Sequence, residues 1–139
     1  MSLEGKHIFI VEDNVVNFAV IRTILRKADA SVPFDNWGDT TLEKMRNYPF
    51  PLDMILLDLM LAHGISGYDV YDALQDVPEL KDVPVVCVSA ADPNIEIPKA
   101  KDKGFRGFIA KPIRQRTFVK QLEAILAGDD SIWGTDDFV

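Results

Sequence analysis

The sequence predicts an α/β fold, in which a doubly wound parallel sheet of five strands is covered by helices on both faces. Five short apolar runs alternate with five stretches of helical character, giving the order βαβαβαβαβα along 139 residues. The runs are nearly continuous in Val, Ile and Leu, which is typical of parallel strands buried on both faces. Such units are joined by right-handed crossovers, and the chain length suits one domain. We therefore expect three layers, α/β/α.

The expected strands are the five apolar runs, namely His7–Val11, Ser31–Phe34, Asp53–Leu57, Pro84–Val88 and Arg106–Ala110. Apolar residues at helical spacing predict three helices, through Val16, Val20, Ile24 and Ala28, through Val70, Ala73, Leu74 and Val77, and through Phe118, Leu122, Ile125 and Leu126. Asn14 stands where the N-cap of the first helix belongs. A weaker helix is expected over Thr40–Arg46. Within Pro93–Lys103 we expect a short helix that begins near Pro98, because proline is costly in a helix interior.

Composition excludes several classes of function. The formal net charge of −7 argues against binding of nucleic acid, whose phosphates attract basic surfaces. The single cysteine, Cys87, rules out an intrachain disulfide, and its place in an apolar run predicts an inert buried thiol. No apolar run is long enough to span a bilayer, and the N-terminal residues lack the character of a signal peptide. We therefore expect no membrane association and a cytoplasmic location.

Polar side chains follow four of the expected strands. Glu12 and Asp13 follow the first, Asp58 the third, Ser89 the fourth and Lys111 the fifth. Ligands of open α/β sheets bind at the carboxyl ends of the strands, so these groups are expected to meet. Three carboxylates that lie close together need a cation, and Mg²⁺ prefers oxygen ligands, water and phosphate. The pattern therefore predicts attack of an Asp58 oxygen on phosphorus, with Lys111 and Ser89 contacting the phosphoryl group.

The same residues resemble the receiver domain of two-component response regulators. The resemblance extends from residue 7 to about residue 127 and is carried by four motifs in order, Ile8-Phe9-Ile10-Val11-Glu12-Asp13-Asn14, Leu56-Leu57-Asp58-Leu59-Met60, Val88-Ser89-Ala90 and Phe108-Ile109-Ala110-Lys111-Pro112. It implies a flavodoxin-like sheet of order 2-1-3-4-5. It also implies phosphorelay signalling, in which a histidine kinase or phosphotransfer protein donates the phosphoryl group.

The resemblance assigns a role to each site residue. Asp58 would be the phosphoacceptor. Asp13 would bind Mg²⁺ directly and Glu12 through water, together with Asp58 and the backbone carbonyl of Met60. Such a domain catalyses its own phosphorylation and dephosphorylation, and turnover of an independent substrate is not expected.

The resemblance further implies a conformational switch. Lys111 would contact the phosphate, Ser89 would be the switch hydroxyl and Phe108 the switch aromatic. The downstream partner is expected to bind the face built by the fourth helix, fifth strand and fifth helix. A cis peptide is expected between Lys111 and Pro112, since only an X–Pro bond is cis at modest cost.

Two regions depart from the family pattern or lie beyond it. Family members often have a glycine eight residues after the acceptor, whereas Gly67 lies nine residues after Asp58, so the loop Leu61–Ser66 is expected to be one residue longer.

We assign residues 1–127 to the receiver domain and residues 128–139 to an acidic tail. Ile132, Trp133 and Phe138 in this tail could dock on a partner or on the domain itself, but we interpret the tail as a flexible, solvated terminus.

Other functions were weighed against this interpretation. A dinucleotide-binding domain needs a glycine-rich turn after the first strand, where this chain has Glu12 and Asp13, and there is no P-loop motif. A receiver-like interaction module that no longer depends on phosphorylation remains an alternative, because sequence does not establish the geometry of the site. Binding of Mg²⁺ and a phosphate mimic would separate the two.

Overall fold

Five parallel strands form the centre of the computed structural model, which describes residues 3–134. The strands lie in the order β2-β1-β3-β4-β5, as expected. Their bounds are Ile8–Val11 for β1, Phe34–Asp35 for β2, Met54–Leu57 for β3, Val85–Ser89 for β4 and Gly107–Ala110 for β5. The helices are α1 Val15–Lys27, α2 Thr41–Asn47, α3 Gly67–Gln75, α4 Pro93–Lys103 and α5 Gln115–Leu126, with a 3₁₀ turn at Ala62–Gly64.

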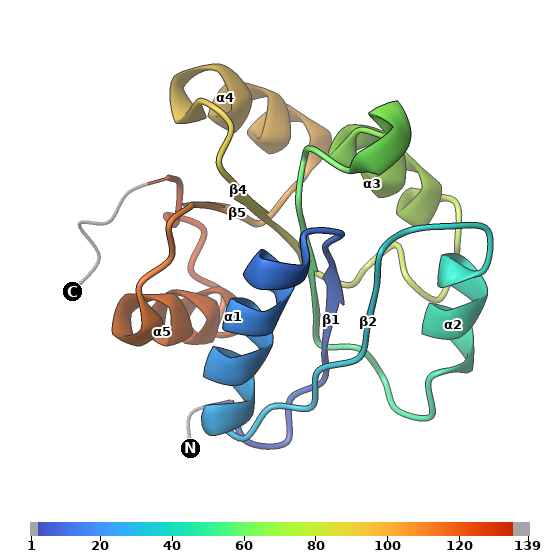
Figure 1. Ribbon diagram of the computed structural model, residues 1–139, viewed down its shortest axis with the longest axis horizontal. Coiled ribbons are helices and arrows are strands. Elements are labelled where there is room, and N and C mark those ends of the chain that lie inside the picture. The colour runs from blue at the N-terminus through green and yellow to red at the C-terminus, as the bar shows by residue number, and fades with distance from the viewer. Residues whose placement is uncertain (1–2, 135–139) are drawn as a thin grey trace.

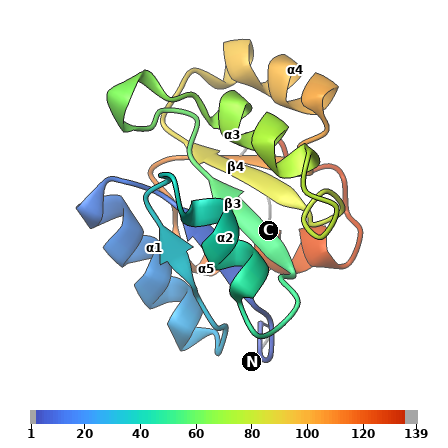
Figure 2. The same cartoon turned by 90° about the vertical axis from the view of Figure 1, so that its right-hand side faces the viewer.

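Helices cover both faces of the sheet, which confirms the three-layer prediction. Figures 1 and 2 show α1 and α5 side by side on one face, and α2, α3 and α4 on the other. Successive side chains of a strand point to opposite faces, so Ile8 and Ile10 of β1 pack towards α1 and α5 while Phe9 and Val11 pack towards α3. Every residue of β1, β3 and β4 is buried. This explains why these strands read as continuous apolar runs.

Local capping fixes where the helices begin. The Asn14 side chain accepts a hydrogen bond of 2.9 Å from the Asn17 N–H, so the predicted N-cap of α1 is confirmed. Ser66 caps α3 in the same manner. None of the helices within residues 3–134 is long and apolar enough to cross a membrane.

The prediction that the fourth helix begins near Pro98 is wrong. The helix α4 begins at Pro93, directly after the N-cap Asp92, and ends at Gly104, whose φ of 112° lies in the left-handed region. Pro98 is the sixth residue of this helix, and the N–H that it lacks would have bonded the carbonyl of Asn94 in the first turn. Asn94 is exposed, so water can solvate its carbonyl, which reduces the cost of the proline.

The second strand is shorter and later than predicted. Ser31 forms a single bridge with His7, and β2 itself comprises Phe34 and Asp35, paired with Ile10 and Val11. Pro33 interrupts the ladder because it has no N–H to donate, although its carbonyl accepts from the Ile10 N–H at 2.9 Å. Edge strands tolerate such interruptions.

The interpretation of the whole tail as solvated is also wrong for residues 132–134, whereas Ser131 is exposed. Ile132 is 1% exposed, and its carbonyl accepts a hydrogen bond of 3.0 Å from the Phe108 N–H of β5. Trp133 forms a parallel bridge with Phe108. Phe138 lies outside the described residues.

Candidate functional site

The predicted site residues meet at one end of the sheet. Glu12 and Asp13 directly follow β1, Asp58 directly follows β3, and Lys111 directly follows β5. Ser89 is the last residue of β4. Because these four strands are parallel and adjacent, their carboxyl ends bring the side chains to a common edge.

Lys111 forms ion pairs with two acids from other strands. Its Nζ lies 2.8 Å from Glu12 Oε1 and 3.0 Å from Asp58 Oδ2. The three side chains are only 11%, 2% and 8% exposed, respectively. Charges that are buried to this extent are stable only when they are paired, so the three groups form one electrostatic unit.

The close packing of these charges shifts the pKa of Glu12 and of Lys111. Burial raises the pKa of Glu12 above its usual 4.5, and the nearby negative charge of Asp58 raises it further, against the lowering effect of Lys111. Burial alone would lower the pKa of Lys111, but hydrogen bonds from its ammonium group to Glu12 and Asp58 raise it above 10.5. Lys111 is therefore a permanent cation at neutral pH, and the site holds a surplus of negative charge.

Asp13 is held by the loop that follows β3. Its Oδ2 accepts a hydrogen bond from the Ala62 N–H, at the start of the 3₁₀ turn. Met60 and Ser66 close the loop through an antiparallel bridge. The turn is completed by His63, whose φ of 61° lies in the left-handed region.

Gly67, which lies nine residues after Asp58, is needed for close packing of α3 against the segment that carries Asp58. A Cβ added to Gly67 would lie 2.5 Å from the Asp58 carbonyl oxygen and 2.7 Å from the Leu59 Cα. The first turn of α3 therefore packs against the backbone of the acceptor segment, where only glycine fits. The loop Leu61–Ser66 contains the 3₁₀ turn, and Gly67 still contacts the backbone of Asp58.

The remaining predicted residues lie around Asp58. The Met60 N–H donates to Asp58 Oδ1 at 3.1 Å, while the Met60 side chain is exposed. Ser89 is fully buried, and its Oγ accepts from the Ala91 N–H at 3.1 Å. Phe108 is fully buried on β5. The peptide between Lys111 and Pro112 is cis, as predicted.

The oxygen donors at the site have the chemistry that Mg²⁺ prefers. Within residues 3–134, no three His, Cys, Asp or Glu side chains are gathered as a ready-made metal site. The reason is that Asp13 bonds Ala62, while Glu12 and Asp58 bond Lys111. The available donors are all oxygens, and the buried Glu12 carboxylate has a raised pKa that a second cation would relieve. The chemistry therefore fits Mg²⁺, provided that Asp13 leaves the Ala62 amide.

Sequence reasoning missed one contact at this site and set aside another at the outer edge of β5. The bond from the Ala62 N–H to Asp13 involves a backbone group, which no residue pattern reveals. Docking of residues 132 and 133 on the domain itself was named only as the alternative to a solvated tail, because a segment of two apolar residues gives no periodic signal. The adjacent Ile132 and Trp133, which follow the polar run Gly128–Ser131, were the available indication.

Comparisons with known proteins agree with the geometry. The family described as the response regulator receiver domain matches residues 8–123. The polar-differentiation response regulator DivK of Brucella abortus is 29% identical over 121 residues, which cover 87% of this chain and 96% of DivK. The rice two-component response regulator ORR7 is 30% identical over 108 residues, and this match spans 78% of the chain but only half of the rice protein.

Solved structures share the fold. The chemotaxis response regulator CheY4 of Vibrio cholerae has a TM-score of 0.75 at 20% identity, covering 86% of this chain and 98% of CheY4. The receiver domain of the sensor histidine kinase PA1611 from Pseudomonas aeruginosa has a TM-score of 0.76 at 23% identity, covering 89% of this chain and 99% of that domain. The latter structure has a magnesium ion coordinated in its active-site cleft.

Proposed function

The chain belongs to the family of response regulator receiver domains, and from this premise we propose that Asp58 accepts a phosphoryl group from a phosphohistidine of a histidine kinase or phosphotransfer protein. The observation that carries the proposal is the position of Lys111 Nζ, which lies 3.0 Å from Asp58 Oδ2 and 2.8 Å from Glu12 Oε1 in a nearly dry environment. This arrangement places a cation beside the oxygen that would bind phosphorus.

The chemistry requires little from the protein beyond placement and charge. An Asp58 carboxylate oxygen attacks phosphorus, the P–N bond to the donor imidazole breaks, and an acyl phosphate forms. The imidazole leaves with the electron pair of that bond and takes up a proton. Lys111 is placed to move from the carboxylate pair to an oxygen of the incoming phosphoryl group, whose charge it would partly neutralise.

A divalent cation would be held by Asp13, Asp58 and the Met60 carbonyl, with Glu12 acting through water. Mg²⁺ would supply charge neutralisation and an orienting contact for the phosphoryl oxygens. Asp13 must first exchange its hydrogen bond with the Ala62 N–H for the metal. The loop Leu61–Ser66 would therefore respond to metal binding.

The phosphorylated state would be read through Ser89 and Phe108. Ser89 Oγ faces the Ala91 amide and can reorient towards a phosphoryl oxygen. Ser89 pairs with Ala110 and Cys87 pairs with Phe108 in the β4–β5 register, so a shift at Ser89 is transmitted to β5. We assign the output surface to the face of α4, β5 and α5, and signalling to a shift between two populations of this face.

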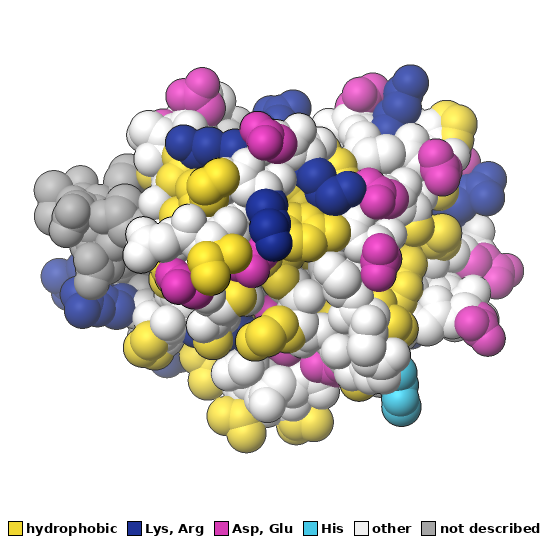
Figure 3. Space-filling model, turned by 90° about the horizontal axis from the view of Figure 1, so that it is seen from above, with side chains coloured by type: hydrophobic (Ala, Val, Ile, Leu, Met, Phe, Trp, Pro, Cys, Tyr) yellow, Lys and Arg dark blue, Asp and Glu magenta, His cyan; other side chains and the backbone are white. Residues whose placement is uncertain are grey.

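The donor protein would approach over the first helix. The helix α1 carries three exposed hydrophobic residues. The exposed fraction is 78% for Val15, 71% for Val16 and 45% for Val20. A groove of about 140 Å³ lies between Val20 and the segment Lys111–Ile113 beside the site. Figure 3 shows the molecule from above the view of Figure 1, the end at which α1 begins, and hydrophobic side chains lie there among interspersed acidic and basic ones. An apolar contact next to Lys111 supports the docking of a helical donor domain here.

The test is incubation with acetyl phosphate and MgCl₂, followed by intact-protein mass spectrometry. Wild type should gain one phosphoryl group, whereas Asp58→Asn and wild type in EDTA should gain none. Phosphorylation of Asp58→Asn at the wild-type rate would refute the assignment. Absence of any phosphorylation in wild type, together with unchanged Mg²⁺-independent binding of partners, would favour the interaction module instead.

A further inference from the structure

Residues 131–134, the C-terminal strap, continue the sheet beyond β5. The Phe108 N–H donates to the Ile132 carbonyl at 3.0 Å, and the Gly134 N–H donates to the Phe108 carbonyl at 2.6 Å. Trp133 pairs with Phe108 in parallel orientation. Since α5 connects β5 to the strap, the three segments form one further βαβ unit, and the strap occupies the place of a sixth strand.

Side chains of the strap alternate between the two faces of the sheet. Ile132 is buried in the cluster formed with α1 and α5, and Trp133 packs against the opposite cluster, which includes Ile97 of α4. Lys101 Nζ of α4 lies 4.9 Å from the centroid of the Trp133 ring, a cation–π distance. The strap therefore joins α4, β5 and α5 through one apolar and one aromatic anchor.

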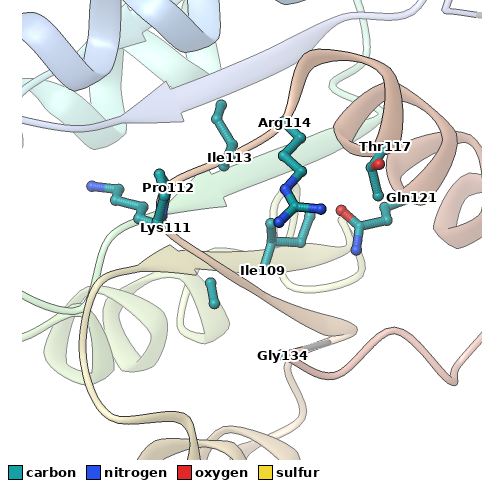
Figure 4. A pocket seen from close by; sticks show the side chains of 9 residues that line it. Ile109, Lys111, Pro112, Ile113, Arg114, Thr117, Gln121 and Gly134 are labelled. Atoms are coloured by element: carbon teal, nitrogen blue, oxygen red, sulfur yellow. The ribbon is translucent and has the colours of Figure 1, made fainter. Parts of the chain in front are cut away.

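Two glycines allow the strap to approach closely. A Cβ on Gly107 of β5 would lie 3.1 Å from the Ile132 carbonyl oxygen and 2.9 Å from Ile125 Cδ1. A Cβ on Gly134 would lie 2.4 Å from Ile97 Cδ1, and its φ of 71° favours glycine in any case. Gly134 also borders a cavity of about 220 Å³, into which Arg114 and Gln121 point while Lys111 points away (Figure 4). The strap is thus a fitted part of this face.

We propose that the strap is an internal occupant of the β5 edge, and that the edge accepts an extended segment of a partner protein when the strap leaves. The partner segment would add to β5 as a parallel strand and carry an aliphatic residue followed by an aromatic one, as Ile132 and Trp133 do. This inference rests on the proposed function only in identifying the face of α4, β5 and α5 as the output surface.

The chemistry of a sheet edge supports this occupant. The outer edge of β5 presents backbone N–H and C=O groups that must be paired or solvated, and adding a strand is a common mode of peptide recognition. Among the described residues, the strap pairs with this edge through two backbone hydrogen bonds, both to Phe108. Such a short pairing can be displaced by a segment that makes the same contacts. Strap and partner therefore compete for one surface.

The competition can be measured without phosphorylation, so its failure is distinct from failure of the phosphoryl transfer. The probe is a fluorescein-labelled peptide with the sequence of residues 128–134, titrated into the full chain and monitored by anisotropy. The strap-released variant is Ile132→Ser with Trp133→Ala in the full chain. The peptide should bind this variant at least tenfold more tightly than wild type, a difference of about 1.4 kcal/mol. A peptide with alanine in place of Trp133 should lose at least tenfold in affinity for the variant.

Hydrogen exchange provides a readout that does not depend on the peptide alone. The Phe108 amide, which donates to Ile132, should exchange at least tenfold faster in the variant and regain protection with saturating peptide. The Ile10 amide of β1, which donates to the Pro33 carbonyl at 2.9 Å and lies away from β5, serves as the internal control and should be unchanged. Equal peptide affinity for wild type and variant, or no binding to either, would overturn the proposal. A wild-type dimer that the variant abolishes would also overturn it, in favour of exchange between copies.

Discussion

Replacing Lys111 by methionine removes the cation that lies between two buried carboxylates. Methionine keeps most of the aliphatic volume, so the loss is chiefly electrostatic. At an effective dielectric constant near 20, the contacts of 2.8 and 3.0 Å each represent about 6 kcal/mol of gross attraction. Most of this offsets desolvation, and removal of one partner from a buried pair typically costs about 3–5 kcal/mol. We expect Lys111→Met to lower the free energy of unfolding by about 3 kcal/mol at pH 7, because Glu12 and Asp58 would remain as unpaired neighbours.

The loss should depend on pH in a defined direction. Burial raises the pKa of Glu12 in the wild type, and loss of Lys111 removes a lowering influence, so this pKa rises further in the variant. A carboxyl group with a raised folded-state pKa contributes stability that is present below its unfolded value of 4.5 and is lost as pH rises through the folded value. The penalty should therefore be largest at neutral pH and should shrink as pH falls towards the raised pKa.

The assay is urea unfolding followed by circular dichroism at pH 7.5 and pH 5, for wild type, Lys111→Met and the double variant Glu12→Gln, Lys111→Met. The double variant is the matched control, since it removes one of the two unpaired charges and should recover more than 1 kcal/mol of the loss, by about the cost of one uncompensated group. A Lys111→Met variant within about 1 kcal/mol of wild type at pH 7.5 would refute the electrostatic unit. So would a penalty that grows as pH falls.

Three further outcomes are expected. Asp13→Asn should weaken Mg²⁺ binding at least about tenfold in a calorimetric titration, because a charged oxygen ligand is lost, and unchanged affinity would count against that role. Burial raises the pKa of the Cys87 thiol, so a thiol reagent should modify the native protein at less than about a tenth of its rate with the urea-unfolded chain; comparable rates would contradict the buried assignment. Met60→Asn and Ala91→Glu should each hydrolyse the acyl phosphate faster than wild type after donor removal, since neither Met60 nor Ala91 can orient the attacking water; equal lifetimes would reject that explanation.

Much of the fold was predictable because its signals are local. Strands buried on both faces appear as apolar runs, and β1, β3 and β4 were found within one residue of their observed bounds. The short edge strand β2 was misplaced because its two residues carry no such run. The start of α4 was misjudged because the cost of Pro98 was set above the combined effect of Asp92 at the N-cap and Pro93 at the first position.

The site was predictable to the extent that it depends on strand ends. Any parallel sheet of this order brings the residues after β1, β3 and β5 together, so the contacts among Glu12, Asp58 and Lys111 follow from topology. The partner of Asp13 does not follow, because it is a backbone amide in a loop whose conformation depends on one additional residue. Local loop geometry is set by φ and ψ choices that side-chain patterns do not encode.

The strand β5 contacts the strap through Phe108 and leads directly to Lys111 of the site, so it could couple the two energetically. Phe108 carries both hydrogen bonds to the strap, and Lys111 follows three residues later, bonded to Ser89 of β4 through its own amide. A displacement of β5 along or away from β4 would change the Lys111 contacts with Glu12 and Asp58 and the pairing of Phe108 at the same time. Coupling between two sites needs an element that both of them bias, and β5 is the element that contacts both the strap and, through Lys111, the site. By linkage, a ligand that displaces the strap and a phosphoryl group that draws Lys111 must affect one another equally. The same peptide titration, repeated with wild type and with Asp58→Asn in the presence of Mg²⁺ and acetyl phosphate, measures that coupling directly.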